Sequence, residues 1–543
     1  MANTIPINTS HGKPGIREKG GSRPSPNNAR EGEGRMVWNR EEMKRRDWLS
    51  DRTYFVLGGC LLVLICFNLF YRLGAMPIED WDEARHGVSA YEMLRKGSYM
   101  INTYNYHDDY WNLKPPLSFW SVALGFKVAG FNPLGLRLFS AIAALITIAI
   151  TALFTRYRYG NTASLLSAAV LATSSQFILS HSARAGDADA LFVLWFTAAV
   201  LSLMLTELHI RWLYVSGLMF SLAFLTKSWH AGVILVIIVL FMLLTRRIFQ
   251  LNLRNMLGLI AASVVPVAVW LGLRFPYDKF TFIKEMIRYD LLTRASSTIE
   301  GHANGPTYYL HILRVFHTKW SLALFLIVLY YTFVMLRRRT LRHLPLDSFT
   351  LGTTLWIAVP FATFTAASTK LMWYILPVYP PLAIVTAFLF TGMLHAMSRR
   401  GFRAALAAAF AAVFILTQTY IVRTLTGSFT SAHGAEQALL RQIQEQGDYS
   451  AYTLFYYEHP DTGNVPQSVM LASKLYGNLK VSEKGTLEDF HKESLGLLLL
   501  PRTAGNETLI TGEKLSIVES NSWGYLLAKN NPGNYISKVK QAQ

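Results

Sequence analysis

The chain has 543 residues, of which 52% are hydrophobic and only 16% are charged, and its formal net charge at pH 7 is +18. This composition is too apolar for one water-soluble domain and is typical of a bundle of membrane-spanning helices. Lysine and arginine occur in short stretches between apolar runs, so the charge favours a lipid bilayer over a nucleic-acid partner. The two cysteines, Cys60 and Cys66, lie in one apolar run, which excludes a disulfide framework and a thiolate metal site.

The N-terminal segment, residues 1–50, is rich in glycine, proline, asparagine, arginine and glutamate and has no apolar periodicity. Such a segment buries too little apolar surface to order itself, so we predict a disordered, basic cytoplasmic tail. The apolar run at residues 53–73 is too long for the h-region of a signal peptide, and no small-residue cleavage site follows it. We expect this run to be the first transmembrane helix.

Crossing the hydrocarbon of a bilayer takes about 20 apolar residues, and eleven candidate runs occur between residues 51 and 423. They begin near residues 53, 134, 161, 188, 212, 230, 256, 319, 349, 372 and 403. The basic loops between them all fall on the side of the N-terminal tail. The positive-inside rule therefore places the tail in the cytoplasm and, because eleven is odd, the C-terminal segment outside.

Two loops on the outer side are long, residues 74–133 and 276–318. In the first, residues 83–95 have apolar side chains at helical spacing, which predicts an amphipathic helix in the membrane interface. Residues 117–131 form a shorter apolar run, for which we expect an interfacial or re-entrant helix. Residues 424–543 alternate short strand-like and helical patterns, which predicts a small extracytoplasmic α/β domain. The expected fold is an all-α polytopic membrane protein of about 11 to 13 transmembrane helices with this C-terminal domain.

The outward loops contain an unusual set of polar residues, which the topology places on one side of the membrane. They are Asp82, Glu83, Arg85, His107, Asp108, Asp109, Lys114, Arg184, Asp187, Asp189, Lys227, His302 and Lys370. Their positions were not used to derive the topology. Charges at helix ends near a polar cavity are typical of functional sites in membrane proteins, so we predict a single external site.

Two of these carboxylates stand at predicted helix starts: Asp82 opens the amphipathic helix, and Asp189 opens the fourth span. The helix dipole stabilises the ionised form of such a carboxylate, which can then act as a general base. The alternative interpretation is helix capping by these residues, together with a surface ion pair of Glu83.

Three lysines are candidates for binding an anion. Lys114 precedes two prolines that fix the backbone, and a rigidly placed ammonium group suits a phosphate. Lys370 begins a segment with several aromatic residues, including Tyr374. Their side chains can line a groove for an isoprenoid chain. For this segment and for Lys227, the alternative is an ordinary aromatic belt with a snorkelling lysine.

A loop histidine, His302, lies shortly before Tyr308 and can bind a metal, a phosphate or nothing. The sequence contains no His-Glu-x-x-His motif, no Walker phosphate loop and no Gly-x-Gly-x-x-Gly fingerprint. Their absence argues against a zinc protease, an ATP-driven pump and a dinucleotide-dependent enzyme.

Six short motifs occur in the order found in one enzyme family. They are Trp81-Asp82-Glu83-Ala84-Arg85, Lys114-Pro115-Pro116-Leu117, Ala183-Arg184 followed by Asp189, Leu225-Thr226-Lys227, His302 with Gly305-Pro306 and Tyr308-Tyr309, and Lys370 through Pro380. Together they resemble the GT-C membrane glycosyltransferases, in the branch of the lipid A aminoarabinose transferases and the bacterial relatives of the protein O-mannosyltransferases. The resemblance runs from about residue 53 to residue 395.

The resemblance implies a polyprenyl-phosphate sugar donor, no nucleotide sugar, and usually inversion at the anomeric carbon. It suggests Asp82 as the catalytic base or the residue that positions the acceptor, and Asp189 as a second essential carboxylate. The implied phosphate-binding residues are Lys114, Arg85 and Lys370, and the further candidates for substrate contacts are Glu83, His302, Tyr374, Lys227 and Tyr308.

One position departs from the family pattern. Aminoarabinose transferases place a glutamate directly before the lysine of the Lys-Pro-Pro motif, as part of a metal site with a histidine like His302. This chain has Leu113 there. Asp108 or Asp109 can replace the missing ligand, although their spacing does not show it. No cofactor therefore follows from the sequence, and a divalent metal at His302 stays open.

We expect a glycosyltransferase that transfers a sugar from a polyprenyl-phosphate donor to a lipid A-like lipid or a glycan at the outer face of the cytoplasmic membrane. A protein acceptor is the first alternative. A transporter of polyprenyl-linked sugars or lipids is the alternative of another class. The external carboxylates favour the transferase, because binding a phosphate headgroup requires cations but not Asp82 and Asp189.

Overall fold

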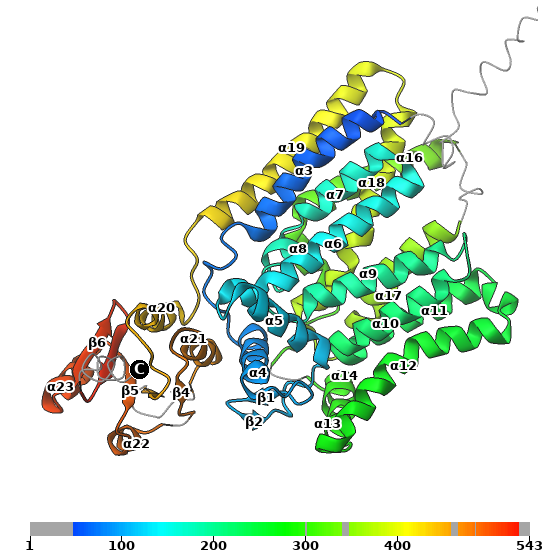
Figure 1. Cartoon of the computed structure of the whole chain (residues 1–543). Helices are drawn as coiled ribbons and strands as arrows, with labels where there is room; N and C mark the ends of the chain where they lie inside the picture. Colours follow the sequence, from blue (N-terminus) through cyan, green and yellow to red (C-terminus); the bar gives the residue numbers. More distant parts are fainter. Residues whose placement is uncertain (1–46, 299–300, 339–346, 458–464, 484, 531–543) are drawn as a thin grey trace, which may run out of the picture.

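The computed structural model describes residues 47–298, 301–338, 347–457, 465–483 and 485–530 (Figure 1). Most of the predicted tail, residues 1–50, lies outside this set. Its last residues are held by hydrogen bonds: the Asp47 carboxylate accepts them from Thr162, and the Ser50 hydroxyl accepts one from the amide of Thr53. The predicted disorder therefore does not include residues 47–50.

Apolar helices form a bundle in which most axes run roughly alongside one another (Figure 1). In chain order they are α3 (Asp51–Phe70), α6 (Pro133–Tyr159), α7 (Asn161–Ala172), α9 (Asp189–Leu205), α10 (Trp212–Lys227), α11 (Gly232–Leu244), α12 (Leu253–Asp278), α16 (Thr318–Arg338), α17 (Ser348–Ala366), α18 (Tyr379–Ala396) and α19 (Arg400–Thr426). A helix satisfies its own backbone hydrogen bonds, which hydrocarbon requires of any chain that crosses it. A multi-pass membrane protein follows from this bundle.

Within the described part of the chain, seven helices are long and apolar enough to span a membrane. An eighth results if Tyr308–Phe316 and Thr318–Val334, which meet at a bend of 107°, form one span. Three further apolar helices, α5 (Pro116–Ala129), α7 and α9, are shorter. The predicted number of eleven spans is therefore not confirmed and stays a prediction.

The segment Trp212–Leu244 satisfies the length and hydropathy criteria as one span, but its contacts show that the chain reverses within it. At the end of α10, Lys227 forms an ion pair with Asp189, the first residue of α9. After α11, Arg247 donates a hydrogen bond of 2.8 Å to Thr206, directly beyond the last residue of α9. The chain therefore returns along α9 through α11, and separate membrane passes beginning near residues 212 and 230 stay a prediction.

Both short helices predicted in the first external loop are present. The amphipathic one is α4 (Asp82–Lys96), which ends at Gly97 in the left-handed conformation with φ 69°. The apolar one is α5, which begins with Pro116 at a position where a missing amide hydrogen costs little. The α5 helix packs closely on the start of α6, because a Cβ atom on Gly125 would collide with the carbonyl oxygen of Gly135.

Several short elements belong to the same end of the bundle, where Figure 1 shows β1, β2, α13 and α14 near α4. They are β1 (Thr103–Tyr104), β2 (His107–Asp108), the 3-10 turn η1 (Ser228–Ala231), α13 (Thr281–Glu285), the π-helix η3 (Met286–Thr293), α14 (Arg294–Ser296), α15 (Tyr308–Phe316) and the 3-10 helix η5 (Met372–Val378). These elements come from distant parts of the sequence. Because they lie at one end of the bundle, their side chains can form one site.

After α19 the chain forms a five-stranded mixed sheet in the order β4-β3-β5-β7-β6. The strands are β3 (Thr453–Tyr456), β4 (Lys480–Val481), β5 (Gly496–Pro501), β6 (Ser516–Ser520) and β7 (Gly524–Ala528), and the helices are α20 (Gly434–Gln442), α21 (Gln467–Gly477), α22 (Leu487–Lys492) and α23 (Ala504–Gly512). Strand β3 runs parallel to β4 and β5, whereas β7 is antiparallel to β5 and β6. The mixed α/β character agrees with the sequence pattern, and an extracytoplasmic location stays a prediction.

This C-terminal region packs directly on α4 and the loop before it. A buried ion pair joins Lys474 of α21 to Glu92 of α4 at 3.1 Å. Gln437 of α20 exchanges two hydrogen bonds with the backbone of Ile78, at 2.8 and 2.9 Å. The amide of Ser468 donates to the Asp80 carboxylate at 2.7 Å. The C-terminal region therefore holds the segment that leads into Asp82.

Candidate active site

A cavity of about 460 Å³ lies where the starts of α4 and α5, the end of α10, and the elements α14 and η5 meet. It brings together five of the residues predicted for the site, although they are far apart in the sequence. These are Asp82, Lys114, Lys227, His302 and Tyr374. The single external site expected from the sequence therefore has a structural counterpart.

Asp82 presents an unpaired carboxylate to this cavity. It is the first residue of α4, and the helix begins after Trp81 without any side-chain cap. No residue in the described part of the chain donates a hydrogen bond to its carboxylate; only its backbone carbonyl is bound, by His86 at 2.6 Å. Burial raises the pKa of Asp82, but the positive charges of Lys114 and the other cations nearby outweigh burial, and the pKa lies below its ordinary value. Asp82 is therefore ionised at neutral pH and free to accept a proton.

Lys114 is the cation with the strongest effect on Asp82. Its backbone is fixed by the two prolines that start α5. Its ammonium group has no ion pair or hydrogen bond to any described residue, and it lines the cavity. The site thus contains a carboxylate and an ammonium group that are both available to a ligand.

Asp189 and Lys227 form a buried ion pair, with side chains only 4% and 3% exposed. Lys227 lines the cavity, whereas Asp189 lies behind it at the start of α9. The amide of Asp189 in turn donates to the Asp187 carboxylate at 2.9 Å. In this arrangement Asp189 fixes the position of Lys227 and does not itself line the cavity.

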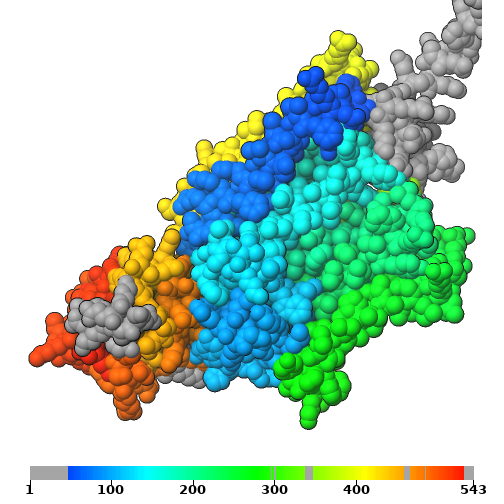
Figure 2. All heavy atoms as spheres, in the orientation of Figure 1, coloured from blue at the N-terminus to red at the C-terminus, as the bar shows by residue number. Residues whose placement is uncertain are grey.

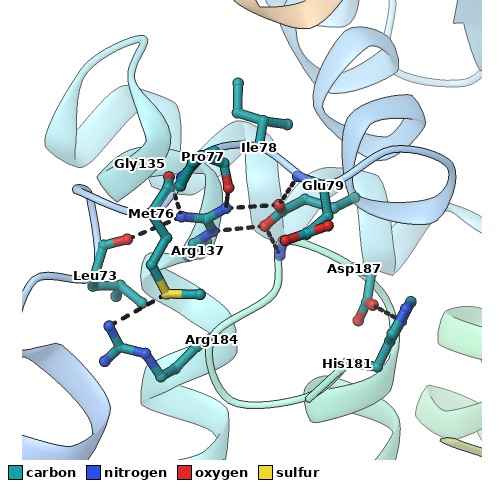
Figure 3. A network of polar contacts seen from close by, with 12 residues as sticks. Leu73, Met76, Pro77, Ile78, Glu79, Gly135, Arg137, His181, Arg184 and Asp187 are labelled. Carbon is teal, nitrogen blue, oxygen red and sulfur yellow. Dashed lines mark hydrogen bonds and ion pairs between the residues drawn. The ribbon is translucent and has the colours of Figure 1, made fainter. Parts of the chain in front are cut away.

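His181 adds another cation, which the sequence analysis did not single out. Its ring stacks on Trp373 with centroids 3.9 Å apart, and its Nδ1 lies 3.2 Å from the Asp187 carboxylate. Figure 3 shows the His181 and Asp187 side chains pointing toward each other. Burial lowers the pKa of His181, but the hydrogen bond to Asp187 and the surrounding carboxylates raise it to about 9. His181 is therefore an imidazolium at neutral pH.

A metal ion does not fit the residues at His302. Leu113, at the position of the family glutamate, is buried in the apolar core. Asp109 is bound to Arg85 at 3.0 Å and Asp108 is exposed, so neither replaces that ligand. Among the described residues, His302 belongs to no group of three ligand-bearing side chains.

The one such group in the described chain is formed by His181, Asp187 and Asp189, whose ligand atoms lie within 4.8 Å of one another. Lys227 already neutralises Asp189. This ion pair opposes a metal ion, because the metal would compete with the ammonium group for the carboxylate.

Comparisons with known proteins concern the fold and part of the sequence. Residues 113–270 match the family described as dolichyl-phosphate-mannose-protein mannosyltransferase. The structure superposes on ArnT from Cupriavidus metallidurans bound to undecaprenyl phosphate, with a TM-score of 0.63 and 14% identity, over 89% of this chain and 99% of that one. It also matches the apo oligosaccharyltransferase of Archaeoglobus fulgidus, with a TM-score of 0.52 and 11% identity, over 82% and 66% of the two chains. The chain resembles the GT-C membrane glycosyltransferases.

The sequence relatives are consistent with this GT-C fold. An uncharacterised protein of Aquifex aeolicus is 29% identical over 60% of this chain and 62% of its own length. The undecaprenyl phosphate-alpha-4-amino-4-deoxy-L-arabinose arabinosyl transferase of Pseudomonas aeruginosa (strain LESB58) is 28% identical over 60% of this chain and 58% of its own. The chain thus matches about three fifths of the length of these curated relatives.

One residue suggested by the GT-C resemblance, Glu83, does not line the cavity. Its two carboxylate oxygens accept hydrogen bonds of 2.7 Å from the guanidinium of Arg137, and also bonds from the amides of Gly186 and Glu79. Arg137 in turn donates to the carbonyls of Leu73, Met76 and Pro77 (Figure 3). Glu83 is therefore neither a substrate contact nor part of a surface pair, because this buried network uses both of its oxygens.

Three other predicted residues also lie outside the cavity lining. Arg85 is paired with Asp109 and lies 4.3 Å from the ring centroid of Trp111, so it supports that ring instead of facing the cavity. The Lys370 ammonium group is buried and donates to the carbonyl of Ala367 at 2.6 Å. Tyr308 is half-buried beside Tyr309, with ring centroids 5.2 Å apart. A role of Arg85 and Lys370 in phosphate binding has no support in this geometry.

A fourth cation in the lining, Arg294, was also not predicted. It forms an ion pair with Asp290 at 3.1 Å and donates to the Tyr374 hydroxyl at 3.4 Å. Burial raises the pKa of Asp290, but Lys114 and its other positive neighbours outweigh burial and lower it. The sequence signal was the four-residue spacing of an acid and a base in an external loop.

Proposed function

We propose that this chain is a glycosyltransferase that takes a sugar from a polyprenyl-phosphate donor at the outer face of the cytoplasmic membrane. The observation that carries the proposal is an ionised, unpaired Asp82 and an unpaired Lys114 in one cavity at the end of an apolar bundle. The name of the Pseudomonas relatives and the undecaprenyl phosphate in the structural neighbour support this donor class.

The reaction requires a base and a stabilised leaving group. An acceptor hydroxyl gives its proton to the Asp82 carboxylate while its oxygen forms a bond to the anomeric carbon. The bond between that carbon and the phosphate oxygen breaks, and polyprenyl phosphate leaves with the electron pair. Attack on the face opposite the phosphate inverts the anomeric configuration. A positioned base contributes about 100- to 10,000-fold to such a rate.

The negative charge that develops on the leaving phosphate requires fixed cations. Lys114 is suited to this role because its backbone is rigid and no described residue neutralises it. Lys227, His181 and Arg294 add positive charge in the same lining, each oriented by its own carboxylate. The isoprenoid chain of the donor can lie in the bilayer that surrounds the helix bundle. Such a site requires neither ATP nor a metal for the donor to react.

The proposed topology places the N-terminus in the cytoplasm and the cavity with the C-terminal region outside. It is tested with single cysteines at Gly305 and Arg254, in a chain without Cys60 and Cys66. An impermeant thiol reagent applied to intact cells should label the first position only. Equal labelling of the two positions would contradict the topology.

A transporter of polyprenyl-linked sugars is the alternative function, since the same cations suit a phosphate headgroup. The ionised Asp82 beside them argues against it, because an unpaired carboxylate repels a phosphate and is costly near a membrane. The acceptor is proposed to be a lipid or a glycan, with a protein as the alternative.

The experiment measures release of free polyprenyl phosphate by the purified chain, given a panel of polyprenyl-phosphate sugars and a membrane lipid extract. Release that depends on one sugar, on the extract and on Asp82 supports the transferase. The matched control is Glu488→Gln, which neutralises an exposed carboxylate of α22 in the C-terminal region. Donor binding without release for any sugar, or equal release by Asp82→Asn, would refute the proposal.

A further inference from the structure

An open groove of about 460 Å³ adjoins the cavity and shares one residue with it, Trp111. Its other lining residues are Asp108, Asp109, Tyr110, Glu285, Arg288 and Tyr289. They come from the two long external loops, at β2 and at the junction of α13 and η3. These segments lie next to each other at the end of the bundle that carries α4 (Figures 1 and 2). The groove therefore provides a second approach to the site from the outer side.

Two exposed tryptophans stand where the groove meets the cavity. Trp81 is 59% exposed and Trp111 is 37% exposed, and their ring centroids lie 6.1 Å apart with an angle of 36° between the planes. Trp81 directly precedes Asp82. Contiguous exposed apolar surface marks ligand-binding grooves and other interaction sites. The two indoles are thus placed to contact a ligand whose reacting atom lies at Asp82.

The positions of both rings are constrained by the structure around them. Trp81 has φ 66° and ψ −116°, a strained backbone for a residue with a side chain, and such strain is typical of functional sites. The ring of Trp111 lies 4.3 Å from the guanidinium of Arg85, which Asp109 holds at 3.0 Å. Ordinary interfacial tryptophans lie at the ends of spanning helices and need neither feature. The pair is therefore more than an aromatic belt.

The groove and the cavity differ in charge. The cavity is lined by four cations and by the carboxylates of Asp80 and Asp82, whereas three carboxylates and one arginine line the groove. Arg288 pairs with Glu285 at 2.8 Å and Arg85 with Asp109, so Asp108 is the groove carboxylate with no ion pair among the described residues. A phosphate-bearing ligand finds no unpaired cation in this groove. The exposed carboxylate of Asp108 and the aromatic faces instead suit the hydroxyl groups and the C–H faces of an uncharged sugar.

We propose that this groove and the Trp81–Trp111 pair form the acceptor site, and that the acceptor presents an uncharged, hydroxyl-rich sugar to Asp82. The inference rests on the proposed transferase activity and names its acceptor class. The donor phosphate occupies the cationic cavity, and the acceptor enters along the groove. The new bond joins the transferred sugar to a sugar hydroxyl, whose proton goes to Asp82, so the product is a glycoside and not a glycosyl phosphate.

The test measures sugar binding and does not require turnover. Short uncharged oligosaccharides of glucose, galactose, mannose and N-acetylglucosamine, and their phosphorylated forms, are added to the full-length chain in detergent. Saturation-transfer NMR reports binding. At least one uncharged sugar should bind about tenfold more tightly than its phosphorylated form, equivalent to about 1.4 kcal/mol. Glu488→Gln, at an exposed position of α22, should keep this binding.

The variants locate the binding surface. Trp111→Ala should weaken sugar binding by about tenfold, whereas Trp111→Phe retains an aromatic face and should lose far less. Asp108→Asn, at an exposed position, gives a second test if Trp111→Ala fails to fold. Trp212→Ala is the matched control, since Trp212 is also 37% exposed. It starts α10, whereas the residue of α10 that lines the cavity, Lys227, is at the end of that helix.

Two results of the sugar-binding measurement would overturn the acceptor proposal. One is that no uncharged sugar in the panel binds better than its phosphorylated form. The other is that binding is unchanged in both Trp111→Ala and Asp108→Asn. If release of polyprenyl phosphate still depends on Asp82 in either case, the transferase stands and only the acceptor class is wrong. A peptide that competes at Trp111 in place of a sugar would also overturn it. Sugar binding without any Asp82-dependent release of polyprenyl phosphate would refute the transferase activity, but the groove would remain a sugar-binding site.

Discussion

Asp82 and Glu83 are neighbours at the start of α4, and their surroundings are opposite. Glu83 is 2% exposed, and Arg137 and two backbone amides satisfy its oxygens. Asp82 faces a cavity, and no described residue donates a hydrogen bond to its carboxylate. The first arrangement fixes a loop and a helix start, and the second leaves a charge available. The contrast separates the carboxylate that builds the site from the one that can react in it.

The same contrast applies to the cations. Arg137 has every neighbour that a buried guanidinium requires, including three backbone carbonyls. Lys114 has no ion pair to any residue that the structure describes. A buried pair such as Glu83–Arg137 stabilises little relative to apolar residues, but removing one partner leaves an uncompensated charge. Each substitution below changes one member of this comparison.

The largest effect is expected for Asp82→Asn. The amide cannot accept the acceptor proton, so transfer should fall about 100- to 10,000-fold. The thermal unfolding midpoint in detergent should stay near that of the wild type, because the carboxylate has no hydrogen bond to lose. The measurement combines a turnover assay with a melting curve. Turnover within a few-fold of the wild type would remove Asp82 from the role of base.

Glu83→Gln should act on stability instead. It leaves Arg137 buried without its counter-charge, which costs about 3–5 kcal/mol. The expected result is a lower unfolding midpoint and a lower yield of folded protein. The double variant Glu83→Gln with Arg137→Met should recover part of the loss, since both charges are then absent. A stable, inactive Glu83→Gln protein would instead place Glu83 in the chemistry.

Lys114→Ala is expected to weaken donor binding. Losing one charge-assisted hydrogen bond to phosphate corresponds to about 1.5–3 kcal/mol, or about a 10- to 100-fold higher KM for the donor. Arg85→Ala provides the comparison within the family motif, because the structure places Arg85 against Trp111 and Asp109. It should raise the acceptor KM more than the donor KM. An increase confined to the donor KM in Arg85→Ala would restore its predicted role in phosphate binding.

The bundle, the amphipathic α4 and the short α5 were predictable because helical periodicity, apolar length, proline and glycine are local signals. The convergence of Asp82, Lys114, Lys227 and His302 on one cavity followed from topology and the family motifs. Pairing was not predictable: nothing in the sequence shows that Glu83 finds Arg137 in α6, more than 50 residues away. Pairing decides which charges remain unpaired in the cavity, as Asp82 and Lys114 do, and this cannot be determined from the motifs.

His181 is a residue of the site that the sequence did not reveal, again because its pairing depends on the fold. It attracted no attention as a lone histidine, since its charge depends on Asp187 and on carboxylates from other helices. Arg294 was missed for a related reason, because an acid and a base four residues apart are common on helix surfaces. Only the fold places Arg294 beside Tyr374 and in the cavity lining.

The smallest effect is expected from the titration of His181, whose pKa is raised to about 9 from an ordinary value of 6.5. A raised pKa means that the folded state holds the proton more tightly. The stabilisation is therefore fully present below about pH 6.5 and is lost as the pH rises through about 9. If the imidazolium also helps to bind the donor phosphate, donor affinity should fall a few-fold between pH 8 and 10.

Asp187→Asn sharpens this prediction, because it removes the carboxylate that contributes most to the raised pKa. The loss of donor affinity should then begin at a lower pH, whereas His181→Gln should abolish this pH dependence. Donor binding measured from pH 6 to 10 in the wild type and both variants provides the check. Identical pH profiles would show that His181 is a fixed part of the Trp373 stack and contributes no charge to donor binding. In that case Lys114, Lys227 and Arg294 alone would supply the positive charge that the leaving phosphate requires.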